Sequence, residues 1–268
     1  LRVEREEHAR ALAALLGLER DATDDGLLVE RARADEIVAT RDDFLGIVSH
    51  DLRNILGNIA MGAAVLAQSA TAGGPPHQAT IAIAERIQRG TARMNRLLGD
   101  LLDVVALEAG ALPIHRRPHD ASLTGKEAVE AHQLSFAAKG VALESQIAAG
   151  SIVAEFDHDR ILQVLANLLS NALKFTERGG RVSLALVGSG SDIQFSVGDT
   201  GVGIPADQAT AIFERFGQVR RDRRGHGLGL YISKCIVEAH GGKIWVDSPG
   251  AGGATLRFTL PKAGAPAS

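Results

Sequence analysis

Two stretches of this chain place apolar residues at alternating steps of three and four, the spacing of a packed helical seam. The first seam contains Leu45, Val48, Leu52, Ile55, Ile59, Gly62 and Leu66. The second contains Ile83, Ile87, Gly90, Met94, Leu97, Leu101 and Val104. Residues 71–76, TAGGPP, lie between them and demand a turn. The pattern therefore predicts an antiparallel helical hairpin. One hairpin buries both seams poorly, so we predict a homodimer in which two copies form a four-helix bundle.

His50 lies on the first of these helices but off its seam. A side chain two positions past a d residue points toward solvent or a docked partner, and Asp51 and Asn54 flank it. An imidazole, a carboxylate and a carboxamide then share one accessible patch. We interpret His50 as a phosphoryl acceptor, although a His-Asp pair by itself is more often an ordinary solvated helix face.

Composition sets broad limits on the chain. Its 268 residues allow one to three domains, and its net charge of −3 gives no case for nucleic-acid binding. No apolar run approaches the roughly 18 residues of a membrane span and no leader opens the chain, so we expect a soluble, cytoplasmic molecule with no membrane segment. It begins at Leu1 rather than Met, so a membrane or sensory segment could precede it. The single cysteine, Cys235, is expected to be a small buried hydrophobe.

The remaining segments suggest four parts in the chain. Residues 1–40, rich in Glu, Arg, Ala and Leu, indicate a connecting helix, weakened at 21–26, that serves dimerisation or signalling or is a solvated linker. Residues 41–110 form the hairpin, 111–262 a second domain and 263–268 a tail. In the second domain we expect helices near 120–138, 157–175, 206–216 and 228–240, and strands near 114–116, 141–147, 152–156, 181–187 and 193–197, with two closing strands. This order favours an α+β sandwich over a doubly wound sheet.

Three segments of the second domain carry candidate chemistry. Asn167, Asn171 and Lys174 share one helix face, where carboxamide oxygens suit Mg2+ and a lysine suits phosphates. Alone, such a trio is more often a plain polar helix face. The other two segments are rich in glycine and are taken in turn.

The segment DTGVGI, residues 199–204, follows a predicted strand. Its glycines permit close approach of a planar ligand, and the Asp199 carboxylate can accept a hydrogen bond from an exocyclic amine. The segment GHGLGL, residues 225–230, leads into a helix, where the amides of Gly227 and Gly229 offer an anion site. The arginines just before it form a lid over a nucleotide or a solvated charge run.

Together these motifs resemble the transmitter module of bacterial sensor histidine kinases. HDLRN, NLLSNALKF, DTGVGI, IFERF and GHGLGL occur in that family's order, across about residues 43–261. The resemblance implies a dimerisation and histidine-phosphotransfer hairpin, followed by an ATP-binding domain of the Bergerat (GHKL) fold that gyrase and Hsp90 share. It also implies a two-component kinase that passes a phosphoryl group to an aspartate on the receiver domain of a response regulator.

The same resemblance assigns roles to residues of this chain. His50 is the phosphoacceptor, Asp51 orients the imidazole and takes its proton, and Asn54 positions water for dephosphorylation. The cofactors implied are ATP and Mg2+. Asn171 would bind Mg2+, Asn167 and Lys174 the phosphates, Phe175 the base and Asp199 the adenine amine. Further nucleotide contacts are expected at Gly201, Gly203, Ile204, Gly225, Gly227, Leu228 and Gly229.

Two positions depart from the family pattern. Ile55 stands where proline is common, which bears on how the bundle bends, and His226 stands where a small hydroxyl residue is common.

Two alternatives stay open beside the kinase. A gyrase- or Hsp90-type ATPase needs no phosphohistidine, and the HDLRN patch weighs against it. A non-catalytic phosphotransfer scaffold is disfavoured because Asn171, Asp199 and the glycine segments are intact.

Overall fold

The computed structural model describes residues 52–67, 77–110, 112–147, 150–215, 227–247 and 252–262. Its chain divides into two compact units, residues 1–94 and 95–268, and each is described by itself. The expected connecting helix at 1–40, the turn at 71–76, the arginines before GHGLGL and the tail at 263–268 lie outside the described residues.

The first unit contains two antiparallel helical segments. Residues 52–67 form one helix, and α2, His77–Glu108, begins in this unit and continues into the second. A Cβ added to Gly62 would lie 3.0 Å from Ile87 Cγ1, and one added to Gly90 would lie 3.1 Å from Ile59 Cγ1. Each glycine therefore lets the two helices approach closely. This pairing confirms the antiparallel arrangement that the two seams predict.

Ile55 belongs to the buried side of this pair. The helix continues through it without a break, and its side chain is 6% exposed, with Cγ2 facing Gly90. Because isoleucine retains its backbone N–H, this position imposes no proline-type kink on the helix.

The second unit contains the end of α2 and a mixed α/β domain. Its further elements are β1 (Arg117–Asp120), α3 (Ala121–Lys139), β2 (Ala142–Ile147), β3 (Val153–Phe156), α4 (His158–Phe175), β4 (Arg181–Ser189), β5 (Asp192–Asp199), α5 (Gly229–Ala239), β6 (Ile244–Val246) and β7 (Thr255–Pro261).

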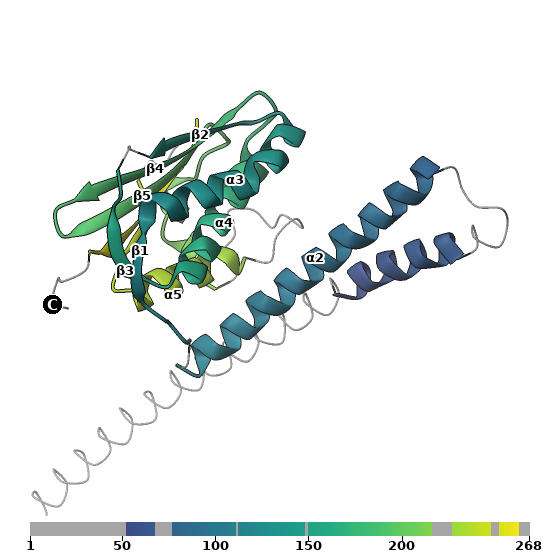
Figure 1. The fold of residues 1–268 in the computed structure, drawn as a ribbon, viewed down its shortest axis with the longest axis horizontal. Helices are drawn as coiled ribbons and strands as arrows, with labels where there is room; N and C mark the ends of the chain where they lie inside the picture. Colours follow the sequence, from purple (N-terminus) through teal and green to yellow (C-terminus); the bar gives the residue numbers. More distant parts are fainter. Residues whose placement is uncertain are drawn as a thin grey trace, which may run out of the picture. The chain divides into compact units, whose positions relative to one another are not determined.

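Five strands form one sheet in the order β2-β4-β5-β7-β6, and β1 pairs with β3 in a separate two-stranded sheet. Only β2 and β4 run parallel among the strand pairs of the described residues; the other pairs are antiparallel. Helices α3, α4 and α5 lie on one side of the five-stranded sheet (Figure 1). The α+β sandwich expected from the sequence is confirmed.

The core lies between these helices and the sheet. Strand β5 alternates strictly, with Ile193, Phe195 and Val197 buried and the residues between them half-buried. Phe195 stacks on Phe258 of β7, with ring centroids 4.9 Å apart. The alternation places the hydrophobic side of β5 toward the core, and it fixes the register of this strand.

Two expected elements differ in the structure. Residues 112–116 are irregular, and the strand begins instead at Arg117, where pairing with Phe156 starts. The expected helix at 206–216 is replaced by two 3-10 turns, Ala206–Gln208 and Ala211–Phe213, after which Glu214 is extended. The second turn buries two consecutive side chains, Ile212 and Phe213. A continuous amphipathic helix would instead bury residues three or four apart.

Candidate nucleotide site

Helix α4 provides the framework of the site. The Asp157 carboxylate caps its N-terminus by accepting a hydrogen bond from the Arg160 backbone N–H at 3.2 Å. Its apolar stripe is buried and consists of Ile161, Val164, Leu165, Leu168, Leu169 and Ala172. A row of polar residues runs along another side of the helix at steps of three and four from Arg160, namely Gln163, Asn167, Asn171 and Lys174.

Asn167 joins α4 to the start of α5. Its side-chain amide donates to the Gly229 carbonyl at 3.2 Å and to Ser233 Oγ at 3.4 Å. The buried Ser233 hydroxyl donates to the same carbonyl at 2.8 Å. A Cβ on Gly229 would lie 3.4 Å from the Asn167 side chain, so glycine leaves room for this approach. The polar side of α4 that holds Asn167 and the GHGLGL segment that holds Gly229 therefore lie side by side.

Asn171 and Lys174 continue the polar side of α4 toward its C-terminus. Asn171 is half-buried, one turn beyond Asn167. Lys174 Nζ lies 4.5 Å from the centroid of the Phe175 ring, and Phe175 is 40% exposed. An exposed aromatic ring beside an ammonium group can accept a planar base, while the ammonium can reach a phosphate.

The donor set fits a magnesium ion that is held largely by phosphates. The described residues contain no group of three or more His, Cys, Asp or Glu side chains that could hold a metal. Magnesium commonly takes one or two protein oxygens, with water and substrate phosphates completing its octahedron. The carboxamide of Asn171 is such an oxygen donor.

Asp199 ends strand β5 beside this helix. Its Oδ1 accepts hydrogen bonds from the backbone N–H groups of Gly201 at 2.8 Å and Ala254 at 3.3 Å. Burial raises the pKa of the Asp199 carboxyl, and these two hydrogen bonds act in the opposite direction. The side chain is therefore held in a fixed orientation by two backbone donors.

Glycines bring the DTGVGI segment against α4. A Cβ on Gly201 would lie 2.5 Å from the Phe175 carbonyl oxygen, so no larger residue fits there without a backbone shift. Gly203 and Gly227 have φ values of 76° and 67°, which favour glycine. Ile204 is half-buried and Leu228 is 2% exposed.

One contributor was not predicted from the sequence, namely the loop before β7. Gly253 has a φ of 120°, and a Cβ there would collide with the Asp199 carbonyl oxygen. This close packing lets Ala254 donate to Asp199. The glycine run in GAGGATL, directly before the last strand, was the available signal.

The histidine patch is described only in part. His50, Asp51, Gly225 and His226 lie outside the described residues, and Asn54 is exposed on the 52–67 helix.

Cys235 is half-buried rather than fully buried, and burial raises the pKa of its thiol.

Comparison with known families identifies both parts of the chain. Residues 40–110 match the His Kinase A (phospho-acceptor) domain. Residues 156–264 match the histidine kinase-, DNA gyrase B- and HSP90-like ATPase family. The chain is a sensor histidine kinase transmitter module. The second part of this transmitter module is thus an ATP-binding domain, and the resemblance noted from the motifs is confirmed.

Curated relatives of the module are histidine kinases. It is 31% identical over 237 residues to the adaptive-response sensory kinase SasA of Crocosphaera subtropica. The matched region covers 87% of this chain and 62% of that kinase. It is 31% identical over 262 residues to the histidine protein kinase DivJ of Caulobacter vibrioides, covering 95% of this chain and 44% of that one. The module therefore spans less than two thirds of these relatives.

Solved structures agree with this assignment. The catalytic domain of the histidine kinase ThkA is 27% identical to this chain, with a TM-score of 0.51. The match covers 55% of this chain and 96% of the ThkA chain. Full-length ShkA in complex with AMPPNP is 26% identical to this chain, with a TM-score of 0.62. The match covers 84% of this chain and 47% of the ShkA chain. Among the described residues, no helix of the transmitter module is both long and apolar enough to span a bilayer.

Proposed function

We propose that this transmitter module belongs to a protein-histidine kinase that uses ATP to phosphorylate His50. The observation that carries the proposal is the contact of Asn167 with Gly229, because it assembles two separate phosphate-binding motifs in one site. That site shares a chain with a phosphoacceptor-type helical pair. An ATPase of the gyrase or Hsp90 type does not need a phosphoacceptor-type helical pair.

Each site residue then has a role toward the nucleotide. Asp199 accepts a hydrogen bond from the adenine amine, and Phe175 packs against the base. Asn167 and Lys174 contact the phosphates, and Asn171 holds Mg2+. When bound, the ion would neutralise phosphate charge. Catalysis is then mainly a matter of positioning and charge stabilisation.

The chemical step transfers a phosphoryl group to nitrogen. An imidazole nitrogen of His50 forms a bond to the γ-phosphorus of ATP as the bond to the β–γ bridging oxygen breaks, and ADP leaves. Asp51 takes the imidazole proton. The group then passes to an aspartate carboxylate on a response regulator's receiver domain, which frees the imidazole. Asn54 positions water when the phosphoryl group is removed from that regulator.

We further propose that two copies pair through the helical segments of the first unit. Large apolar side chains there are exposed in the single chain, namely Leu56 at 55%, Met61 at 68%, Val65 at 41% and Ile81 at 45%. Apolar side chains left exposed on a helical pair are the kind of surface that a partner can cover. A second copy of the same helices would cover it and form a four-helix bundle.

Labelling with γ-labelled ATP and Mg2+ tests the kinase proposal. We expect label that is lost in acid and retained in alkali, as for a phosphoramidate. His50→Ala should abolish the label while binding of a non-transferable ATP analogue persists. His132→Ala is the matched control, since His132 lies on α3 and its Nδ1 forms a hydrogen bond with the Ala128 carbonyl one turn away, at 2.8 Å. Label that persists in His50→Ala would rule out the assignment. Nucleotide binding without any label would favour the scaffold.

A further inference from the structure

A lysine of α3 holds the C-terminal turn of α4. Lys139 Nζ donates to the Leu173 carbonyl at 2.6 Å and to the Lys174 carbonyl at 3.0 Å. The last four carbonyl groups of an α-helix have no partner within the helix, so each needs one from elsewhere. Lys139 binds two of these carbonyls from a different helix, and its positive charge lies at the negative end of the α4 dipole.

The other two carbonyls of this turn meet loop residues. The Ala172 carbonyl accepts from the Thr176 N–H at 3.0 Å and from Thr176 Oγ1 at 2.7 Å, and Thr176 is fully buried. The Phe175 carbonyl oxygen lies where a Cβ on Gly201 would be only 2.5 Å away. The DTGVGI segment therefore packs directly on this turn, and a shift of the turn would displace the segment.

The same turn carries two of the proposed nucleotide contacts. The Lys174 carbonyl that Lys139 binds belongs to the peptide group that joins Lys174, the proposed phosphate contact, to Phe175, the proposed base contact. A lysine in the last turn of a helix can itself bind the final carbonyls. Here Lys139 takes that role, and the Lys174 ammonium lies 4.5 Å from the centroid of the Phe175 ring. A main-chain contact with α3 therefore places both side chains.

The end of α3 gives Lys139 a fixed support. Helix α3 ends at Gly140, whose φ of 71° suits glycine and whose N–H bonds to the Ala137 and Phe136 carbonyls. Phe136 is 1% exposed, so the last turn of α3 is anchored in the core. The Gly140 carbonyl accepts from the Gly179 N–H at 2.7 Å, which ties the end of α3 to the loop after α4. Lys139 therefore projects from a rigid helix end, and it is half-buried.

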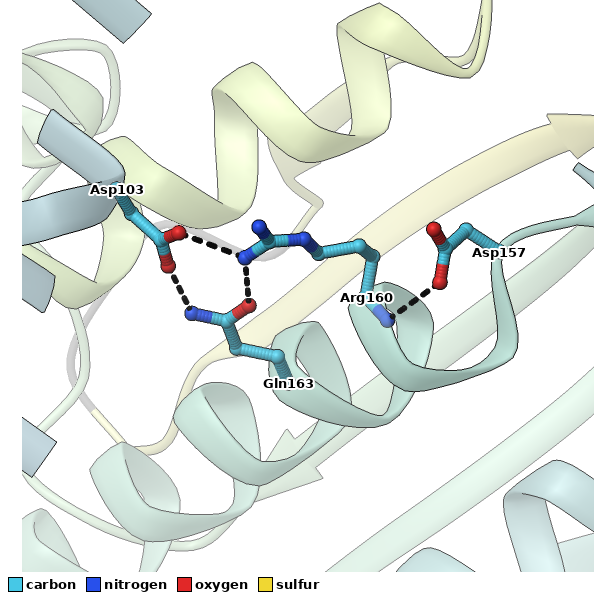
Figure 2. Close-up of polar contacts among 4 residues, drawn as sticks. All are labelled: Asp103, Asp157, Arg160 and Gln163. Atoms are coloured by element: carbon cyan, nitrogen blue, oxygen red, sulfur yellow. Dashed lines mark hydrogen bonds and ion pairs between the residues drawn. The ribbon is translucent and has the colours of Figure 1, made fainter. Parts of the chain in front are cut away.

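The N-terminal end of α4 is held by other residues. The Asp157 carboxylate accepts from the Arg160 N–H at 3.2 Å. The Asp103 carboxylate accepts from Arg160 Nη1 at 2.7 Å and from Gln163 Nε2 at 2.6 Å, as Figure 2 shows. The turn that Lys139 binds lies about 15 Å further along the helix axis from Gln163. Removing the Lys139 donor should therefore loosen the last turn of α4 and leave its start in place.

We propose that Lys139 is a positioning residue for nucleotide binding, and that its hydrogen bonds to the last turn of α4 hold Phe175 against the base and Lys174 toward the phosphates. The inference rests on the proposed kinase function. Lys139 acts through the main chain of α4 and not by contact with the nucleotide. Without it, binding must first order the turn, and ordering two rotamer-rich side chains weakens affinity by roughly 5- to 150-fold.

Titration with a non-transferable ATP analogue tests this role. Lys139→Met keeps a long unbranched side chain and removes the donor, and its Kd should be about tenfold higher than that of wild type. Lys139→Arg keeps the charge and the donors on a differently shaped head group, and it should bind within about threefold of wild type. A thermal melt of each variant establishes that the protein is folded at the temperature of the titration.

Lys262→Met is the matched control. Lys262 Nζ also donates to a backbone carbonyl, that of Gly190, at 2.7 Å. Gly190 precedes β5, whose opposite end carries Asp199 after a strand of about 23 Å. This variant loses the same charge and the same kind of hydrogen bond away from the site, so its Kd should equal that of wild type.

A double-mutant cycle shows whether Lys139 acts through the proposed base contact. In the Phe175→Ala background, Lys139→Met has only the Lys174 side chain left to displace, so its effect on Kd should fall from about tenfold to about threefold. Amide hydrogen exchange gives a readout without ligand, because Lys139→Met should exchange faster at residues 172–178 but not at 158–164. If Lys139→Met does not fold, Lys139→Gln, which keeps a donor without the charge, should raise the Kd by about threefold.

The outcomes separate this inference from the kinase proposal. An unchanged Kd in folded Lys139→Met would overturn the positioning role. So would an equal loss in Lys262→Met, a failure of arginine to restore binding, or an undiminished effect in the Phe175→Ala background. If the wild type binds the analogue but takes no label from ATP, the kinase proposal fails, and the binding comparison still decides the role of Lys139. A wild type that binds no analogue would overturn both.

Discussion

Replacing Asp199 with asparagine separates recognition of the nucleotide from stability of the fold. The Oδ1 atom of Asp199 holds the Gly201 and Ala254 backbone donors at 2.8 Å and 3.3 Å. An asparagine can keep an oxygen at that position, but it places an NH2 group where the second carboxylate oxygen was. The proposed adenine amine would then face a donor instead of an acceptor. We therefore expect Asp199→Asn to fold normally and to bind ATP weakly.

The magnitude follows from the kind of hydrogen bond that is lost. A hydrogen bond to a charged group contributes roughly 1.5–3 kcal/mol. Its loss corresponds to a Kd that is about 10- to 150-fold higher. Isothermal titration with a non-transferable ATP analogue measures this directly, and a thermal melt reports on the fold. Asp199→Ala is the comparison, because it removes the acceptor of both backbone N–H groups and should also lower the melting temperature.

Acidification provides a further check on Asp199. Burial raises the pKa of this carboxyl, so the ionised acceptor is lost at a higher pH than for an ordinary aspartate. Wild-type affinity for the analogue should fall on mild acidification, while the affinity of Asp199→Asn should change less. The reasoning is refuted if Asp199→Asn binds within twofold of wild type, or if it melts as early as Asp199→Ala.

Three other substitutions probe the packing of the second unit. Gly201→Ala would place a Cβ 2.5 Å from the Phe175 carbonyl oxygen, so we expect weaker ATP binding and a lower melting temperature. Gly99→Ala meets nothing within 4 Å and should instead raise the melting temperature, since alanine stabilises a helix interior by up to about 1 kcal/mol over glycine. His240 Nε2 accepts a hydrogen bond from the Asp157 N–H at 3.0 Å, and burial lowers the pKa of this imidazole. The contribution of neutral His240 to the free energy of unfolding is therefore present above the unfolded pKa of about 6.5 and is lost as the pH falls below it. Thermal melts at pH 7.5 and pH 5 should show the stability gap between wild type and His240→Leu narrowing, and an equal gap at both pH values would contradict this assignment.

Local periodicity explains why the helical pair could be predicted. Residues that recur every three or four positions lie on one side of a helix whatever surrounds it. Residues of the predicted seams that the structure describes are accordingly buried or half-buried, from Leu52 to Leu66 and from Ile83 to Val104. Caps are equally local, and Asp120 and Gly140 bound α3 within a residue of the expected ends.

Short segments with weak periodicity were harder to predict. The two 3-10 turns near Ile212 carry helix-forming residues, but their conformation depends on what covers two adjacent buried side chains. The start of β1 depends on its pairing with β3, which lies more than thirty residues further along the chain. Neither feature has a signal within its own stretch of sequence.

The helical seams, the caps, the order of the motifs and therefore the family could all be predicted from the sequence alone. It also identified Asn167, Asp199 and the glycines as candidates, because residue type and spacing suffice for that. The folded structure was needed to show which of these residues are in contact, namely Asn167 with Gly229 and Asp199 with Ala254. The contact of Asp103 with Arg160 belongs to the same class. Each pair is more than fifty residues apart, and its contact depends on how helices cross and which strands are neighbours in the sheet, which no local pattern encodes.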